Sequence, residues 1–271
     1  MHKWKINGSL IMRTFFAVAV YFILSGCNHQ KAGKNESGIK PVVADSSLLK
    51  PDYPKGTHIN SEKRKEITDV FLKRISVPVL ASLPLVDDYT NVKFRDSKDV
   101  AKRSIILNGL LRVAFKANSA NEAMVYFKKY GLWNDVSDDE KKYLTDGNRT
   151  NKQDNTMTWR SEGLNVLLWA LNSFDTLPLP IHECDLDKFK NLPDLETDPS
   201  LWINSVKLRN TEEILNETDL IYRINWATDE ARIHKKSMPF NLSADIVYER
   251  HYALNWLTMY EDNWDDITTD T

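Results

Sequence analysis

Residues 159–173, with the sequence WRSEGLNVLLWALNS, constrain the fold more than any other stretch of the chain. From Leu164 to Leu171 the run is apolar on almost every side of a helix. Such a helix has no polar face to turn toward water, so other elements must cover it all round. Pro178 and Pro180 follow the run and end it. We therefore expect a central apolar helix surrounded by other helices.

Other helices are predicted from apolar spacing and from capping residues. Ser97 precedes about twenty residues with helical spacing that end near Phe115, and Ser137 with Glu140 forms a capping box. Strand signals are nearly absent, and the one candidate, residues 77–85, contains two prolines. Further helices are predicted at residues 120–130, 185–191, 199–206, 211–234 and 243–260, with a polar loop at 149–156. The pattern predicts an all-α fold, a single globular multi-helix domain.

The first 26 residues have the pattern of an export signal. Three basic residues precede ten apolar residues, 15–24, and the segment closes with LSGC at 24–27. This ending resembles the signal of bacterial lipoproteins, in which a peptidase cuts before a cysteine that carries a diacylglycerol. The resemblance implies that Cys27 is lipidated and becomes the new N-terminus. An uncleaved membrane span needs about 20 apolar residues, so the run is too short for one. Met12 is an alternative start, because a complete signal follows it.

Residues 27–60 have the composition of a flexible tether, with glycines and prolines scattered among polar residues. A flexible chain of this length spans about 30 Å on average, which would hold a domain just off a membrane. The alternative is a packed N-terminal arm that uses the apolar residues at 42–43 and 48–49. The remaining residues, 61–271, suffice for one domain that buries about 70% of its unfolded surface.

Charge and cysteine content exclude some classes of function. Removal of residues 1–26 takes away three basic residues and no acidic ones, which leaves Lys+Arg 33 against Asp+Glu 38, a net charge of about −5. Nucleic-acid binding needs a clustered basic face, so we expect no nucleic-acid partner. Once Cys27 is acylated, Cys184 is the only remaining thiol, so no intramolecular disulfide can form. The fold must rest on its core.

Three of the predicted helices combine carboxylates with aromatic residues on one face, and any chemistry is expected there. On the 211–234 helix, Asp219 and Arg223 are one turn apart and can pair. The candidate catalytic carboxylates are Glu162, Asp219 and Glu249, and the candidate binding residues are Trp159, Arg160, Tyr222, Arg223, Trp226, Arg250 and Trp256.

These carboxylates allow two interpretations. In the first, they form a buried salt-bridge network with Arg223 and Arg250 that fixes the register of the helices. In the second, one desolvated carboxylate acts as general acid or base in a pocket where tryptophans stack a sugar or another flat ligand. An open cleft that holds two of the carboxylates favours the second interpretation, and full burial beside arginines excludes it.

No established catalytic motif is present: the chain lacks a nucleophile elbow, a phosphate-binding glycine loop and a dinucleotide fingerprint. The sequence HECD at 182–185 offers metal-capable side chains without the spacing of a helical zinc site. The acidic end, residues 261–271, lacks the EF-hand pattern, and we expect it to dock Trp264 as a structural tail. We predict no metal and no cofactor.

Several segments have distinctive sequences: WRSEGLNVLLWAL, HECD, LRNTEEILNETDLIYRINWA, ERHYALNWL and WDDITTDT, with VPVLASLPLVDD and VKFRDSKDVAKRSIIL before them. In this order they resemble the bacterial domain-of-unknown-function 4272 family over residues 61–271. The resemblance implies a mainly helical fold and no demonstrated catalytic role. The characteristic positions that it implies are Trp159, Arg160, Glu162, Asp219, Arg223, Trp226, Glu249, Arg250, Asn255, Trp256, Trp264, Asp265, Asp266 and Asp270.

The sequence therefore predicts an extracytoplasmic lipoprotein, held at a membrane by the lipid on Cys27. Its helical domain is expected to bind an unknown protein or small-molecule ligand. One alternative is a hydrolase that uses buried carboxylates near tryptophans. A second alternative is a purely structural envelope protein, which predicts neither a cleft nor stabilisation by a ligand.

Overall fold

Between residues 48 and 271, the part of the chain that the computed structural model describes, all regular secondary structure is helical and no strand occurs. The all-α prediction is confirmed. The predicted signal peptide, Cys27 and most of the predicted tether lie outside the described residues. The helices are α1 (Ser61–Arg74), α2 (Ser97–Ala114), α3 (Ala120–Lys129), α4 (Asp138–Thr145), α5 (Asn151–Thr158), α6 (Arg160–Ala170), α7 (Ser200–Ser205), α8 (Thr211–Ile233) and α9 (Ala244–Leu257). Short 3-10 turns occur at η2 (Trp133–Asp135), η3 (Leu186–Asn191), η4 (Pro239–Asn241) and η5 (Trp264–Asp266). Within this range, no helix combines the length and the apolar character that a membrane crossing requires.

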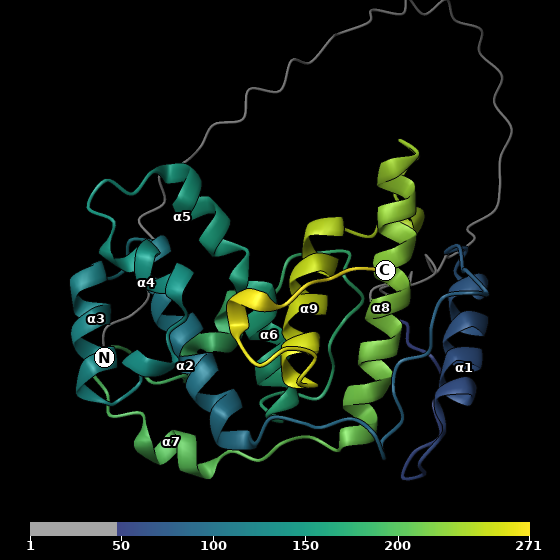
Figure 1. Cartoon of the computed structure of the whole chain (residues 1–271), viewed down its shortest axis with the longest axis horizontal. Coiled ribbons are helices and arrows are strands. Elements are labelled where there is room, and N and C mark those ends of the chain that lie inside the picture. The colour runs from purple at the N-terminus through teal and green to yellow at the C-terminus, as the bar shows by residue number, and fades with distance from the viewer. Residues whose placement is uncertain (1–47) are drawn as a thin grey trace, which may run out of the picture. The chain divides into compact units, whose positions relative to one another are not determined.

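Helix α6 is the predicted central helix, and it begins at Arg160 and ends at Ala170. All of its residues from Glu162 onward are buried, because α2 covers one side and α9 covers another. The neighbouring helices follow in the order α1, α8, α9, α6, α2 and α3 across the domain (Figure 1). The larger apolar cluster includes Leu110, Phe127 and Leu167, and a smaller one joins α1 to α8 through Leu72.

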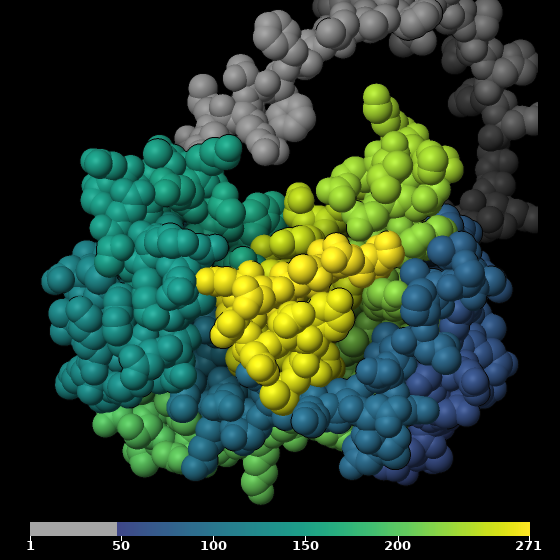
Figure 2. Space-filling model, in the orientation of Figure 1, coloured from purple at the N-terminus to yellow at the C-terminus, as the bar shows by residue number. Residues whose placement is uncertain are grey.

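The C-terminal segment, residues 258–271, closes one face of the domain. Figure 2 shows it in yellow across the middle of this face. Trp264 is buried, as the sequence predicts, and its ring lies 5.1 Å from the ring of Tyr252. The side-chain amides of Asn225 and Asn255 donate to the carbonyl oxygens of residues 269 and 268. The segment is therefore held by both packing and hydrogen bonds.

An N-terminal cap was predicted from the sequence for each of helices α4 and α2. The capping box of Ser137 and Glu140 is present at α4, as predicted. The cap of α2 is Asp96, and the expected cap, Ser97, is the first helical residue. The Asp96 carboxylate accepts hydrogen bonds from the backbone N–H groups of residues 98 and 99. It takes the capping role because a carboxylate also favours the positive end of the helix dipole.

Two helices and one extended region differ from the sequence-based prediction. Helix α5 replaces the loop expected at 149–156, and a capping box of Thr150 and Gln153 starts it. Helix α1 was not predicted, because buried Arg64 and Thr68 interrupt its apolar spacing. The weak strand signal at 77–85 corresponds to turns and irregular structure, which its two prolines favour.

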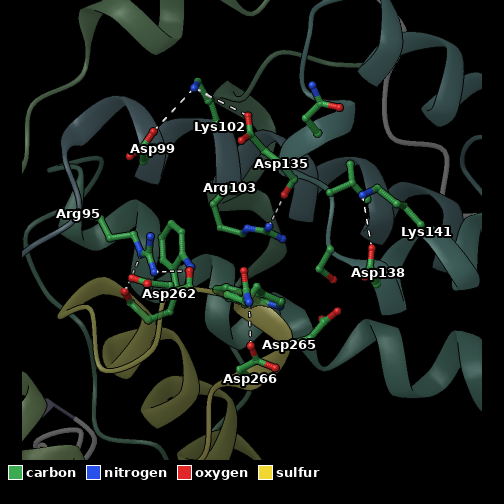
Figure 3. A pocket seen from close by; sticks show the side chains of 16 residues that line it. Arg95, Asp99, Lys102, Arg103, Asp135, Asp138, Lys141, Asp262, Asp265 and Asp266 are labelled. Carbon is green, nitrogen blue, oxygen red and sulfur yellow. Dashed lines mark hydrogen bonds and ion pairs between the residues drawn. The ribbon is translucent and has the colours of Figure 1, made fainter.

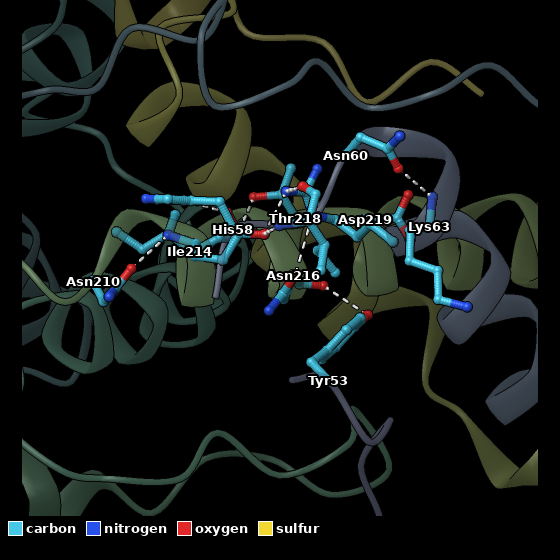
Figure 4. Close-up of polar contacts among 12 residues, drawn as sticks. Tyr53, His58, Asn60, Lys63, Asn210, Ile214, Asn216, Thr218 and Asp219 are labelled. Atoms are coloured by element: carbon cyan, nitrogen blue, oxygen red, sulfur yellow. Dashed lines mark hydrogen bonds and ion pairs between the residues drawn. The ribbon is translucent and has the colours of Figure 1, made fainter. Parts of the chain in front are cut away.

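The segment of residues 50–60, here called the arm, packs on the domain where a flexible tether was expected. The Lys50 Nζ atom lies 2.8 Å from Glu217 Oε2, and the Tyr53 hydroxyl lies 2.7 Å from Thr68 Oγ1. Figure 4 shows Tyr53 and His58 beside polar residues of α8. The composition indicated a tether because glycine and proline are frequent there, and the partners on α8 lie more than 150 residues away in sequence.

Candidate functional site

The first predicted carboxylate, Glu162 of α6, forms a buried ion pair with Arg250 of α9. Its Oε2 atom accepts from both Nε and Nη2 of the arginine at 3.1 Å, and each residue is 1% exposed. The other carboxylate oxygen accepts from the backbone N–H of Cys184 at 2.5 Å. The remaining arginine nitrogen donates to the carbonyl of Pro178. All polar atoms of the pair are thus used within the protein.

Cys184, which contacts this pair, is not an activated thiol. Its Sγ atom donates to the carbonyl of Ser161 at 3.6 Å. Burial, with a smaller contribution from the Glu162 carboxylate, raises the pKa of Cys184 to about 12. The thiol is therefore protonated at neutral pH and is a poor nucleophile.

The second predicted carboxylate, Asp219, pairs with Arg223 on the same helix, as their spacing predicts. The Oδ1–Nη2 and Oδ2–Nε distances are 2.6 and 3.0 Å. The hydroxyl of Thr68 on α1 donates to Oδ2 at 2.5 Å, and Asp69 lies 3.8 Å from the guanidinium. The pair therefore joins α8 to α1.

The third carboxylate, Glu249 of α9, is paired with Arg160 at 3.1 Å and is 7% exposed. Burial raises the pKa of Glu249, and the guanidinium of Arg160 acts in the opposite direction. The same guanidinium lies over the ring of Tyr252, 4.5 Å from its centroid. Arg160, which the sequence placed among the binding residues, is thus the partner that the salt-bridge interpretation lacked.

The structure brings two of the three carboxylates together. Glu162 and Glu249 lie at the contact between α6 and α9, and the charge of Glu162 contributes to the raised pKa of Glu249. Asp219 lies at the contact between α1 and α8. They form three separate ion pairs rather than one network. Because each is buried beside an arginine, the geometry argues against the hydrolase interpretation, which required an open cleft.

Three of the seven predicted binding residues are buried, and the other four are partly buried. Arg223 and Arg250 are buried in ion pairs, and Trp159 and Trp226 are partly buried. Trp256 is 5% exposed, and its ring packs 5.4 Å from that of Trp264. Of the seven residues, Trp256 and Tyr222 line open pockets, which are two different ones.

Trp256 lines the first of these, here called the charged pocket, which has a volume of about 400 Å³ between α2, the start of α4 and the C-terminal segment. Its basic and acidic side chains face one another (Figure 3). Arg103 binds both oxygens of Glu140 at 2.8 Å, and Arg95 donates to the carbonyls of residues 261 and 262. Lys102 and Lys141 each have aspartate partners. Because each of its four basic side chains already has a partner within the protein, we interpret this pocket as the contact that holds the C-terminal segment.

Within residues 48–271, no group of three or more His, Cys, Asp or Glu side chains could hold a metal ion. This finding includes the HECD sequence at 182–185 and the acidic end of the chain.

The second pocket, here called the α8–α9 pocket, has a volume of about 470 Å³, within the range of small-molecule sites. It is lined by Thr218 and Tyr222 of α8, His251 and Asn255 of α9, the loop 85–93 and the C-terminal segment. His251 is 2% exposed, and its Nδ1 atom has no hydrogen-bond partner. Its ring centroid lies 5.8 Å from that of Tyr222.

The imidazole of His251 is neutral at physiological pH. Burial lowers its pKa from 6.5 to about 4, although the nearby carboxylate of Asp270 acts in the opposite direction. An unpartnered polar atom in a buried position costs about 1–3 kcal/mol, so a pocket that contains one is a candidate binding site. His251 is not among the binding residues that the sequence analysis predicted. The available signal was the one-turn spacing of two polar pairs, 218 with 222 and 251 with 255.

The free energy of unfolding should fall as the pH is lowered from about 6.5 to about 4. In this interval the unfolded chain protonates His251, whose ordinary pKa is 6.5, whereas the folded chain keeps it neutral down to about 4. The contribution of the neutral ring to stability is complete above the pKa that His251 has in the unfolded chain, and it is lost as the pH falls to the pKa that His251 has in the folded chain. The lowering of the His251 pKa corresponds to a change of about 3 kcal/mol in the free energy of unfolding. Urea unfolding at several pH values measures it, and a His251→Leu variant with the same pH profile as the parent would show that another group is responsible.

Comparison with known proteins identifies the family of the chain. A family model described as a domain of unknown function (DUF4272) matches residues 64–267. No curated protein and no solved structure matches the chain.

Proposed function

We propose that this chain, which belongs to the DUF4272 family, is a lipoprotein whose helical domain binds a small ligand. The description of the family assigns no activity. The anchor in this proposal is a lipid on Cys27. The binding site is the α8–α9 pocket. Two observations on one residue carry the binding function: His251 lines this pocket, and its buried Nδ1 atom has no hydrogen-bond partner.

The signal at residues 1–26 supports the anchor, because basic residues, a short apolar run and LSGC occur in the order that lipoproteins use. The arm packs on α8 from Lys50 onward. The linker between the lipid and the domain would therefore have about 22 residues and, if flexible, span about 25 Å on average. The domain would stay close to the membrane surface.

The pairing of charges elsewhere supports the choice of pocket. The carboxylates of α6, α8 and α9 are bound to arginines, and the basic side chains of the charged pocket have partners within the protein. Trp264 of the charged pocket also has a buried nitrogen without a partner. The α8–α9 pocket combines such a nitrogen with exposed apolar residues at its rim, Leu85 and Tyr260. A ligand that hydrogen-bonds to this nitrogen and covers the apolar rim would gain binding free energy from both contacts.

For the anchor, we expect replacement of Cys27 by serine to move the protein from the membrane fraction to the soluble fraction of the producing bacterium. The thiol sulfur is the atom that accepts the lipid. Each buried methylene of the acyl chains contributes about 0.8 kcal/mol to membrane binding. Fractionation followed by mass spectrometry of the N-terminal peptide measures this. Cys184→Ser serves as the matched control and should remain with the membrane. An unmodified Cys27 in the parent would contradict the anchor.

For binding, we expect at least one compound in a panel of sugars, polyols, amines and amino acids to raise the unfolding temperature of the parent. A ligand at 100 times its Kd adds about 2.7 kcal/mol to the free energy of unfolding, which corresponds to a rise of several degrees. The same compound should leave His251→Leu unshifted and should stabilise His182→Leu, a matched variant at an exposed position. If no compound in the panel shifts the parent, the structural-protein alternative is favoured.

A further inference from the structure

The buried polar side chains of the α8–α9 pocket, Thr218, His251 and Asn255, offer more hydrogen-bond acceptors than donors. The hydroxyl of Thr218 donates to the carbonyl of Ile214, so only its lone pairs remain available. The side-chain amide of Asn255 donates to the carbonyl of Thr268, which leaves its own oxygen as an acceptor. A neutral His251 ring presents one donor and one acceptor. A hydroxyl group on a ligand can satisfy Nδ1 in either tautomer, because it both donates and accepts.

The charge of the pocket is concentrated in its exposed part. Asp87 and Asp270 line it together with Lys93, and all three are exposed. Two carboxylates against one ammonium give this part a net charge of about −1. The buried part holds only uncharged groups, since burial keeps His251 neutral. A ligand would therefore place a positive charge near the solvent and neutral polar groups inside.

The walls of the pocket are partly aromatic and apolar. Tyr222 is partly buried, Tyr260 is 59% exposed and Leu85 is 45% exposed. Tyrosine rings and aliphatic side chains of this kind can cover one flat apolar face of a ring-shaped ligand. Two tyrosines beside carboxylates also favour an ammonium group, because the ring faces attract cations.

We propose that the α8–α9 pocket takes a small hydroxylated ammonium compound of the amino-sugar class, with a ring hydroxyl on His251 and the ammonium beside Asp87 and Asp270. This inference rests on the proposed binding function and adds the chemical class of the ligand. The apolar face of the sugar ring lies against the tyrosines of the wall.

The experiment is isothermal titration calorimetry of the full chain in detergent with two probes, glucosamine and glucose, which differ by an ammonium in place of a hydroxyl. At about pH 6.5 the folded His251 ring stays neutral. Glucosamine should bind about fivefold more tightly than glucose, because an exposed ion pair contributes up to about 1 kcal/mol. The double variant Asp87→Asn with Asp270→Asn should reduce glucosamine binding to the level of glucose. Both replaced side chains are exposed, so the fold should be kept. The matched control, Asp187→Asn, lies on the 3-10 turn η3 outside the pocket and should change nothing.

Three results would overturn the inference, and each separates its failure from that of the proposed function. If glucose binds as tightly as glucosamine and His251→Leu abolishes both, the pocket binds ligands and the ammonium class is wrong. If glucosamine binds more tightly but the double variant leaves its affinity unchanged, the ammonium lies elsewhere. Binding of neither probe also overturns the ligand class, and the compound panel then decides the proposed function by itself.

Discussion

Replacement of Arg250 by methionine is expected to lower the free energy of unfolding by about 3–5 kcal/mol. The variant leaves the Glu162 carboxylate, which is 1% exposed, without its cation and away from water. It also leaves the carbonyl of Pro178 without the donor that Arg250 supplies. Such a loss is a large fraction of the 5–15 kcal/mol that typically stabilises a domain. Equilibrium unfolding in urea, followed by circular dichroism, measures it.

Two further variants separate the ion pair from other effects at this position. The double variant Glu162→Leu with Arg250→Met should be more stable than Arg250→Met alone, because no unpaired charge remains in the core. Arg232→Met, at an exposed arginine that pairs with Asp229 on α8, should cost less than about 1 kcal/mol. An Arg250→Met variant as stable as the parent would mean that Glu162 does not depend on the arginine, and the hydrolase interpretation would regain support.

Trp264→Ala is the second substitution for which we expect a large effect, again about 3–5 kcal/mol. The indole is 3% exposed, packs edge-to-face on Tyr252 and Trp256, and lies under the guanidinium of Arg103 at 4.7 Å. Its removal opens a cavity where the C-terminal segment meets α9. Thermal unfolding measures the loss, and hydrogen exchange of the backbone amides of residues 264–271 should show faster opening of this segment.

The matched control for Trp264→Ala is Tyr260→Ala in the same segment. Tyr260 is 59% exposed, so its truncation should change the free energy of unfolding by less than about 0.5 kcal/mol. If both variants lose the same free energy, or if the amides exchange at the parent's rate in Trp264→Ala, the segment is not held by the indole.

The helices that the sequence predicted are those with regular apolar spacing or a capping box. Central helix α6 was predicted because its apolar run is long and broken only by Asn165, and α8 and α9 because their patterns extend over many residues. Helix α1 was not, since two of its inward positions are Arg64 and Thr68. Their burial is stabilised by partners on α8, Glu212 and Asp219, which are distant in sequence.

In the candidate site too, a contact between residues close in sequence was predicted, and contacts between residues distant in sequence were not. The pairing of Asp219 with Arg223 follows from a one-turn spacing, and the structure confirms it. The partner of Glu249 could not be predicted, because Arg160 lies 89 residues away on another helix. The role of His251 was missed for a related reason. A histidine on a helix face becomes notable only when the neighbouring helix, a loop and the C-terminal segment enclose it and leave one nitrogen without a partner.

The long-range ¹H–¹⁵N NMR spectrum of the His251 ring in the full chain tests whether the α8–α9 pocket binds a ligand through this residue. It is recorded at about pH 7, with and without a compound from the panel that raises the unfolding temperature. We expect a neutral ring in the free protein and a shift of the Nδ1 resonance when the compound binds. A charged ring, or a stabilising compound that leaves both ring nitrogens unchanged, would contradict the claim and place the binding site elsewhere.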